Sequence, residues 1–229
     1  HKSYLIMLFV EDLLNKLKKN KISFYTGVPD SILKNLSLYL DKLNKSNHII
    51  AANEGNAISI GIGHYLSKKK IPCVYLQNSG LGNAINPLIS IAHKKVYSVP
   101  LFLIIGWRGS PNQKDEPQHN AKGRITTKIL KLLNIKYCIL KNKKDLNKLS
   151  LLIKKSHMTN MPVACLVEKN ILKTRKKINT KLNNKSLILR KDFISSLLNK
   201  ISNKTKIIST TGYTSRELMQ IRKENGLSK

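Results

Sequence analysis

Short apolar runs alternate with amphipathic stretches along most of this chain, and that alternation limits the folds open to it. Runs rich in Ile, Val and Leu and bounded by Gly, Pro or Asn predict strands, whereas leucines at every third or fourth position predict helices. When strands and helices alternate, each helix carries the chain back to the edge where the next parallel strand begins. The order therefore predicts a doubly wound α/β fold with a mostly parallel six-stranded sheet and helices on both faces.

The elements can be placed by residue number. The expected strands occupy residues 22–28, 48–52, 71–77, 100–106, 136–140 and 162–167, and the run at 48–52 is expected to be buried. The expected helices occupy residues 9–19, 31–43, 55–66, 125–133 and 146–155, and a further helix ends near residue 92. The polar segment 107–119 is too long for a plain connection between a strand and a helix, which makes it a candidate functional loop.

Composition changes after residue 168, where a segment rich in Lys and Asn lacks any periodicity. Such a segment predicts a linker, which we place at 169–186 between a first domain, 1–168, and a second unit, 187–229. In the second unit we expect a helix at 190–201, a strand at 206–209 and a helix at 215–223. This unit is too short to bury a core of its own and is expected to be the incomplete start of another α/β domain.

The formal net charge of +30 raises the question of a nucleic-acid partner. Lysine is spread through the whole chain, however, and Arg, which suits bidentate base and phosphate contacts, is scarce. The sequence contains no zinc-finger, helix-turn-helix or aromatic RNA-binding pattern. We therefore expect an anionic small substrate and no specific nucleic acid, while a basic α/β module that binds nucleic acid through its charge stays open as an alternative.

The apolar runs and the cysteines indicate the cellular compartment of the protein. No apolar run reaches the roughly 18–20 residues that a membrane-spanning helix needs, so no membrane partner is expected. Cys73, Cys138 and Cys165 lie far apart in apolar runs, without metal-ligand spacing, which predicts free thiols in a reducing compartment. The sequence thus predicts a cytoplasmic protein with no metal ligands of its own.

Polar clusters follow three of the expected strands, at 27–31, 53–57 and 77–83. The carboxyl ends of parallel strands share one edge of the sheet, where open α/β folds place their ligand crevices. Each cluster also has a plainer explanation: Asp30 and Ser31 as helix caps, the glycines as turn formers, and Glu54 as a helix-terminal residue facing water. Three clusters at one edge favour a binding site, although the glycine-rich patterns of dinucleotide and P-loop sites are missing from the sequence.

The segment 107–119 brings a Trp, an Arg, two carboxylates and a His together after a strand. One interpretation is a solvated loop with a surface ion pair. The other is a segment that faces the substrate, with Arg108 directed at an anion and His119 handling protons.

Five segments occur in an order that resembles a known family: GVPDS at 27–31, ANEGNAI at 52–58, QNSGLGNAINPL at 77–88, GWRG at 106–109 and DEPQH at 115–119. They are similar to the N-terminal, pyrimidine-binding half of thiamine diphosphate-dependent decarboxylases of the phosphonopyruvate decarboxylase family, close to sulfopyruvate decarboxylase. TTGYTSREL at 210–218 resembles the start of that family's diphosphate-binding half. The resemblance implies the thiamine diphosphate-binding fold and decarboxylation of 3-phosphonopyruvate to phosphonoacetaldehyde and CO2, with sulfopyruvate or another 2-oxo acid as the alternative substrate.

The resemblance also implies roles for individual residues. Glu54 matches the glutamate that hydrogen-bonds the aminopyrimidine ring of thiamine diphosphate and promotes loss of the thiazolium proton. Asp30 and His119 complete the implied catalytic set: Asp30 is expected near the cofactor's reactive carbon and the substrate, and His119, together with Gln118, is expected to relay protons. The implied cofactor-binding set adds Pro29, Asn78, Gly80, Gly82, Thr211 and Gly212, and the substrate-binding set consists of Ser31, Ser79, Gln118 and, from its charge alone, Arg108.

The family's Gly-Asp-Gly…Asn segment, which holds Mg²⁺ and the diphosphate, does not occur in the sequence. The ligands of the metal and of the diphosphate are therefore expected outside this chain. The sequence leaves open a truncated chain, a split subunit or a non-functional remnant. We expect the chain alone to be inactive, and its partner to be another copy in a homo-oligomer or a chain that carries the diphosphate-binding domain.

Overall fold

The computed structural model describes residues 7–111, 113–175, 188–210 and 212–226. The chain divides into two compact units, residues 1–178 and 179–229. The first unit contains the alternating strands and helices that the sequence predicts, and the described part of the second contains two helices.

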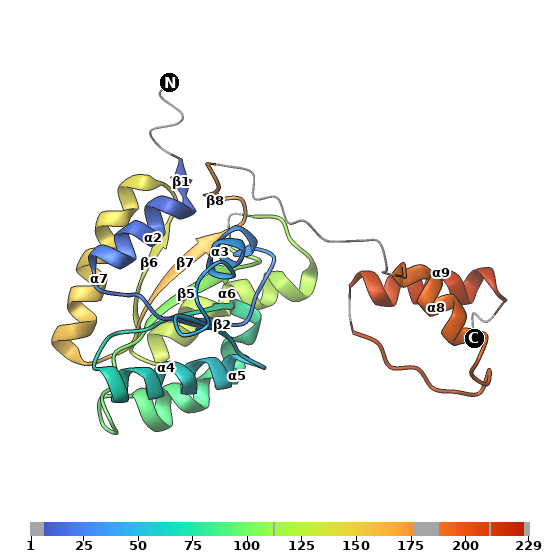
Figure 1. Cartoon of the computed structure of the whole chain (residues 1–229), viewed down its shortest axis with the longest axis horizontal. Coiled ribbons are helices and arrows are strands. Elements are labelled where there is room, and N and C mark those ends of the chain that lie inside the picture. The colour runs from blue at the N-terminus through green and yellow to red at the C-terminus, as the bar shows by residue number, and fades with distance from the viewer. Residues whose placement is uncertain (1–6, 112, 176–187, 211, 227–229) are drawn as a thin grey trace. The chain divides into compact units, whose positions relative to one another are not determined.

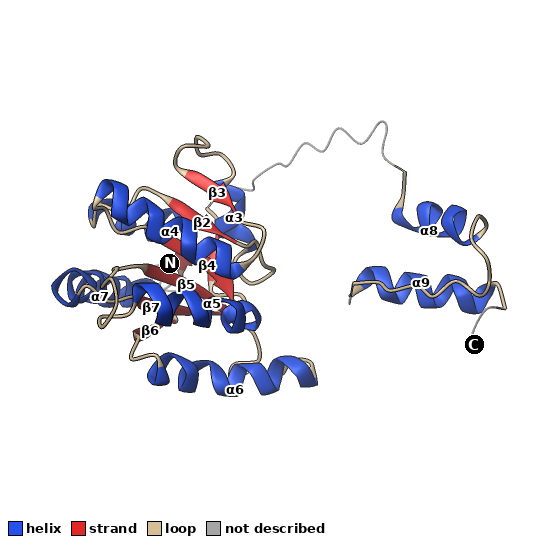
Figure 2. Cartoon of the chain, turned by 90° about the horizontal axis from the view of Figure 1, so that it is seen from below, coloured by secondary structure: helices blue, strands red, loops and turns tan. Residues whose placement is uncertain are grey.

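The first unit is built around a six-stranded sheet in which every neighbouring pair of strands is parallel. Figure 2 shows the strands in their order β3-β2-β4-β5-β7-β6. They are β2 (Tyr25–Gly27), β3 (His48–Ile50), β4 (Cys73–Gln77), β5 (Phe102–Trp107), β6 (Lys136–Leu140) and β7 (Val163–Glu168). The chain runs outward from β2 to β3 and then returns to the other side of β2 for β4. The carboxyl ends of β2 and β4 therefore form the point at which the strand order reverses, where sheets of this kind bind their ligands.

Helices cover both faces of the sheet, which confirms the predicted doubly wound α/β fold (Figure 1). On one face lie α2 (Val10–Lys19), α3 (Lys34–Leu40) and α7 (Leu146–Thr159), which share an apolar cluster containing Leu13, Leu36 and Leu149. On the other lie α4 (Glu54–Lys68), α5 (Leu81–Pro87), the π-helical turn η2 (Leu88–Ala92) and α6 (Pro117–Leu132), around a cluster containing Ala57, Leu81 and Leu130. Two short 3-10 turns, η1 (Asn78–Gly80) and η3 (Lys143–Asp145), follow β4 and β6.

The apolar run at 48–52 forms a strand, but the prediction that this strand is buried is wrong. β3 pairs only with β2 and lies at the edge of the sheet. Ile49 is 39% exposed and Ile50 is 55% exposed, because no further strand or helix covers them in the described part of the chain. An apolar run alone does not distinguish an edge strand from a central one, since either can carry β-branched residues.

The first unit also extends beyond the predicted domain end at residue 168. Leu172–Lys173 forms β8, which pairs in parallel with β1 (Leu8–Phe9). The Asn35 side-chain amide on α3 donates a 2.9 Å hydrogen bond to the Leu172 carbonyl oxygen. The start of the predicted linker is therefore part of the fold, because it supplies backbone partners to the N-terminal strand and to α3.

The second unit contains α8 (Arg190–Leu198) and α9 (Tyr213–Glu224). Ile194, Leu198 and Ile221 form a small apolar cluster between these helices, and Arg190 Nε lies 2.5 Å from Glu217 Oε2. The predicted strand at 206–209 is wrong: these residues have no regular secondary structure, and Ile208 is 99% exposed. A strand needs a neighbour for its backbone hydrogen bonds, and the described residues of this unit provide none.

Candidate active site at the carboxyl edge of the sheet

Glu54 is the first residue of α4, and its carboxylate is turned toward the segment that follows β4. The helix begins with Asn53 as N-cap, whose side-chain oxygen accepts a 2.9 Å hydrogen bond from the Asn56 amide. Glu54 Oε2 accepts a 2.9 Å hydrogen bond from Asn83 Nδ2. Glu54 Oε1 packs on Gly80 so closely that a Cβ atom at Gly80 would lie 2.0 Å away. The half-buried carboxylate is therefore held by a neighbouring segment, in contrast to a capping residue that faces only water.

Asp30 follows β2 and packs against the end of β5. Its Oδ1 accepts hydrogen bonds from the Ile32 amide at 2.5 Å and the Leu33 amide at 3.2 Å, so the predicted capping role is present. Its Oδ2 is buried, has no hydrogen-bond partner of good geometry among the described residues, and would lie 2.8 Å from a Cβ atom at Gly106. Burial raises the pKa of Asp30, and the two amides and the Arg108 charge oppose this only in part. Asp30 is thus a carboxyl group that keeps a proton more readily than an exposed aspartate.

Gln77, the last residue of β4, interacts with Asp30 and with Ser79. Ser79 Oγ donates a 2.8 Å hydrogen bond to Gln77 Oε1, and the Gln77 side chain also lowers the pKa of Asp30 against the effect of burial. Glu54 packs on Gly80, the next residue after Ser79, so residues 77–80 lie between Asp30 and Glu54, and we call Asp30, Glu54 and residues 77–80 the polar rim. The structure thereby brings together the ends of β2 and β4 and the start of α4, as the three polar clusters predict.

Asn78 is buried and bonded within the protein. Its Nδ2 donates to the Arg108 carbonyl at 2.9 Å and to Thr126 Oγ1 at 3.0 Å, and its Oδ1 accepts from the Arg108 amide at 3.1 Å. Both amide hydrogens are therefore used in joining the end of β4 to the end of β5 and to α6. The structure shows Asn78 as a residue that positions the backbone of Arg108.

Arg108 forms an ion pair with Asp115, as one of the two interpretations of this loop predicts. Arg108 Nη2 lies 2.7 Å from Asp115 Oδ1, and Nε lies 3.1 Å from Oδ2, which is a bidentate geometry. Asp115 Oδ2 also accepts from the Gly109 amide, and Oδ1 accepts from the Glu116 amide. The hydrogen bond with Arg108 holds the pKa of Asp115 well below its usual range. Much of the Arg108 charge is thus neutralised within the protein.

The loop after β5 is packed closely onto α6. Gly109 has a φ of +64°, and a Cβ atom there would lie 1.8 Å from the His119 carbonyl oxygen. Trp107 Nε1 donates a 2.9 Å hydrogen bond to the Gly123 carbonyl. The predicted helix at 125–133 begins much earlier, at Pro117, because proline suits the first position of a helix.

His119 lies in the first turn of α6, with a buried Nδ1 that has no hydrogen-bond partner among the described residues. Burial and the nearby Arg108 charge lower the pKa of His119, so the ring is neutral near pH 7. Gln118 is exposed, and its amide lies 3.3 Å from Glu116 Oε2.

The remaining residues that the sequence predicts for the site make few contacts with the polar rim or lie outside the first unit. Pro29 and Ser31 are exposed beside Asp30, and a Cβ atom at Gly82 would meet no other atom within 4 Å. Thr211 lies outside the described residues. Gly212 belongs to the second unit, where it precedes α9 with a φ of +104°.

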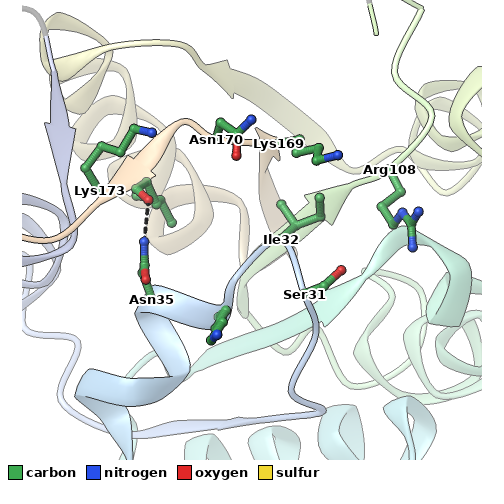
Figure 3. Close-up of a pocket in the computed structure, with 9 residues that line it drawn as sticks. Ser31, Ile32, Asn35, Arg108, Lys169, Asn170 and Lys173 are labelled. Carbon is green, nitrogen blue, oxygen red and sulfur yellow. Dashed lines mark hydrogen bonds between the residues drawn. The ribbon is translucent and has the colours of Figure 1, made fainter. Parts of the chain in front are cut away.

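A pocket of about 400 Å³ opens beside Asp30 and contains several residues that the sequence interpretation missed (Figure 3). Ser31, Ile32, Lys34, Asn35, Arg108, Lys169, Asn170, Leu172 and Lys173 line it. Gln77 and Asn83 were also missed as site residues, although both belong to the polar cluster after β4. Within the described ranges, no group of three His, Cys, Asp or Glu side chains is placed to hold a metal ion. No helix in those ranges is long and apolar enough to cross a membrane.

Comparison with known proteins identifies the family. Residues 7–132 match the family model described as thiamine pyrophosphate enzyme, N-terminal TPP binding domain. The chain belongs to this family. The match includes Asp30, Glu54 and Gly80, and so places the polar rim within the family's cofactor-binding domain.

Two kinds of curated relative are similar to the chain. A phosphonopyruvate decarboxylase from Streptomyces hygroscopicus is 33% identical over 139 residues, which are 61% of this chain and 34% of that protein. The sulfopyruvate decarboxylase subunit alpha of Methanococcus maripaludis is 36% identical over 116 residues, which are 51% of this chain and 67% of that protein. The chain therefore matches only about a third of the length of the Streptomyces relative.

A solved structure supports the fold. The benzoylformate decarboxylase from Polynucleobacter necessarius superimposes with a TM-score of 0.54 at 16% sequence identity. The superposition covers 84% of this chain and 36% of that protein. At this low identity the likeness concerns the fold alone.

Proposed function

We propose that this chain supplies the aminopyrimidine side of a thiamine diphosphate-dependent decarboxylase that converts 3-phosphonopyruvate to phosphonoacetaldehyde and CO2. The observation that carries the proposal is the Glu54 carboxylate, held against Gly80 at the carboxyl edge of the sheet in a domain of the thiamine pyrophosphate enzyme family. The relatives named phosphonopyruvate decarboxylase support this choice of substrate.

The residues present fit the cofactor. Gly80 lacks the Cβ atom that would displace the Glu54 carboxylate, and Asn83 fixes one carboxylate oxygen. Glu54 would hydrogen-bond the aminopyrimidine ring nitrogen. Bound thiamine diphosphate would supply the electron sink that decarboxylation of a 2-oxo acid requires. We place the ligands of Mg²⁺ and of the diphosphate outside this chain.

Asp30 is suited to donate a proton and His119 is suited to accept one. The reaction replaces a carboxylate with a proton, and Asp30, whose pKa is raised by burial, can deliver that proton at the edge of the sheet. His119, whose pKa is lowered by burial, is neutral and can accept a proton. Both lie near the Arg108 charge, Asp30 in the loop after β2 and His119 in the first turn of α6.

The complete active site needs a second contributor. We propose either another copy of the chain in a homo-oligomer or a chain that carries the diphosphate-binding domain, acting in the cytoplasm. Relatives named subunit alpha support the second arrangement and make sulfopyruvate the alternative substrate.

Replacing Glu54 in the assembled enzyme tests the proposal. We expect Glu54→Gln and Glu54→Ala to lower the turnover of 3-phosphonopyruvate by about 10²–10⁴-fold, the usual contribution of a positioned acid or base. CO2 release measures the rate, and circular dichroism checks that the fold persists. Asp41→Asn is the matched control, because Asp41 is a half-exposed carboxylate at the far end of α3 and should not affect turnover. Near-normal turnover by Glu54→Ala would refute the proposed function.

A further inference from the structure

The pocket beside Asp30 is unusually rich in positive charge. Four of its nine lining residues are Lys or Arg, compared with 42 of the 229 residues in the whole chain. Figure 3 shows Lys169 and Lys173 on the segment after β7, with Ser31 and Asn35 across the pocket and Arg108 at one side. A generally basic surface alone does not explain this enrichment, because the neighbouring depression around Pro29 and Asp30 contains only one lysine among its lining residues.

The walls of the pocket are fixed to the first unit. The Asn35 amide binds the Leu172 carbonyl at 2.9 Å, and β8 pairs with β1. Asn170, at a φ of +66°, forms the turn between β7 and β8. Lys169 therefore projects from this turn and Lys173 from β8, and Figure 3 shows both across the pocket from Ser31 and Asn35.

The free charge in the pocket comes from its lysines. Asp115 neutralises Arg108 through the bidentate pair at 2.7 and 3.1 Å. Lys34, Lys169 and Lys173 form no ion pair with any carboxylate in the described part of the chain. None of the described lining residues is acidic, so the pocket presents three uncompensated positive charges near one another. Such an arrangement attracts anions most strongly when they carry more than one charge.

We propose that this pocket binds a phosphonate or phosphate dianion, with Lys34, Lys169 and Lys173 as its charged contacts. The proposal rests on the proposed function and deepens it, since the ligand would be the phosphonate end of the substrate. Ser31 and Lys34 also line the depression that contains Asp30. A substrate whose phosphonate occupies the lysine pocket thus has its other end on the Asp30 side of the polar rim.

Lysine contacts explain a preference for phosphonate over sulfonate. A lysine ammonium acts as a point charge, whereas the planar guanidinium of arginine also selects ligands whose oxygens fit its bidentate geometry. Because Coulomb energy scales with the charge of the ligand, three lysines favour a dianion over a tetrahedral monoanion of the same size. The pocket is therefore expected to separate phosphonates from sulfonates by charge.

Calorimetry on the full chain at low ionic strength and about pH 9, where methylphosphonate is a dianion and lysine is still protonated, tests the proposal with methylphosphonate, methanesulfonate and pyrophosphate as probes. We expect methylphosphonate to bind at least about tenfold more tightly than methanesulfonate. Lys169→Gln with Lys173→Gln should weaken methylphosphonate binding at least about tenfold. Lys154→Gln with Lys155→Gln removes the same charge from the exposed surface of α7 and should change it less than about twofold.

Three results would overturn the proposal: equal affinity for the two methyl compounds, equal losses in the two double variants, or binding of pyrophosphate without methylphosphonate. If the Lys169 and Lys173 double variant does not fold, Lys34→Gln on α3 replaces it, with an expected loss of about threefold to tenfold. Failure here is distinguishable from failure of the proposed function. The calorimetry needs no turnover, and normal turnover by Glu54→Ala would leave the anion pocket unaffected.

Discussion

Glu54 and Arg108 both follow strands at the same edge of the sheet, but only Arg108 is paired with an opposite charge in the described part of the chain. Glu54 is held by a neutral amide from Asn83 and by close packing on Gly80, and it has no ion pair among the described residues. Arg108 is bound at two atoms by Asp115. A charge that the protein fixes without neutralising it is available to a ligand, whereas a charge paired within the protein mainly shapes its loop.

The largest effect expected from this comparison follows Gly80→Ala. The added Cβ atom would lie 2.0 Å from Glu54 Oε1, so the carboxylate must move. Since a misplacement of about 1 Å can cost about 10²-fold, we expect turnover by the assembled enzyme to fall by about that factor. Gly63→Ala on α4 is the control, because a Cβ atom there meets nothing within 4 Å. Equal turnover by the two variants would mean that the position of Glu54 does not matter.

A loss of stability is expected for Asp115→Asn, which breaks the charged pair with Arg108. We expect the free energy of unfolding to fall by about 1–3 kcal/mol at pH 7, as is typical for a hydrogen bond to a charged group. The folded pKa of Asp115 is lowered, so its contribution is complete above the pKa of an unfolded aspartate, about 4, and is lost as the pH falls through the folded value. Urea unfolding of both proteins from pH 7 down to about pH 3 should therefore show the difference shrinking only in acid. A difference that stays constant into acid would contradict the pairing.

The smallest effect, of opposite sign, is expected for Asp30→Asn. Burial raises the folded pKa of Asp30, so the wild-type chain loses stability as the pH rises above the unfolded pKa of about 4. The asparagine oxygen can still accept from Ile32 and Leu33, so the variant should unfold slightly less readily at pH 7. Urea unfolding measures this gain. The stability of the variant minus that of wild type should therefore be larger at pH 7 than at pH 4. A smaller difference at pH 7 would show that burial does not destabilise the Asp30 charge.

The sequence predicted the helices and strands of the first unit better than it predicted the strand order and the burial of each strand. The strand at 136–140 has the predicted bounds, and Glu54 lies at the predicted start of a helix after a strand. Periodicity reports which side chains are apolar, but it does not report the strand order, and so the exposure of Ile49 and Ile50 on the edge strand was not foreseen.

Side-chain partners were harder still to predict. The ion pair of Arg108 depends on the course of the loop that brings Asp115 back to it, and the sequence allowed both a paired and an anion-facing arginine. The lysine pocket combines residues from α3 and from the segment after β7, which are held together by the pairing of β8 with β1 and by the hydrogen bond from Asn35 to the Leu172 carbonyl. In a chain with lysine at most surfaces, no local pattern distinguishes Lys34, Lys169 and Lys173 from the others.

The most direct test of the central claim, that Glu54 activates thiamine diphosphate, is the exchange of the cofactor's thiazolium C2 proton for deuterium. NMR of the acid-quenched assembled enzyme after mixing with D₂O gives this rate without any substrate. We expect Glu54→Gln to slow the exchange by about 10²-fold or more relative to wild type, while Asp41→Asn leaves it unchanged. An unchanged rate in Glu54→Gln, with the cofactor still bound, would contradict the account.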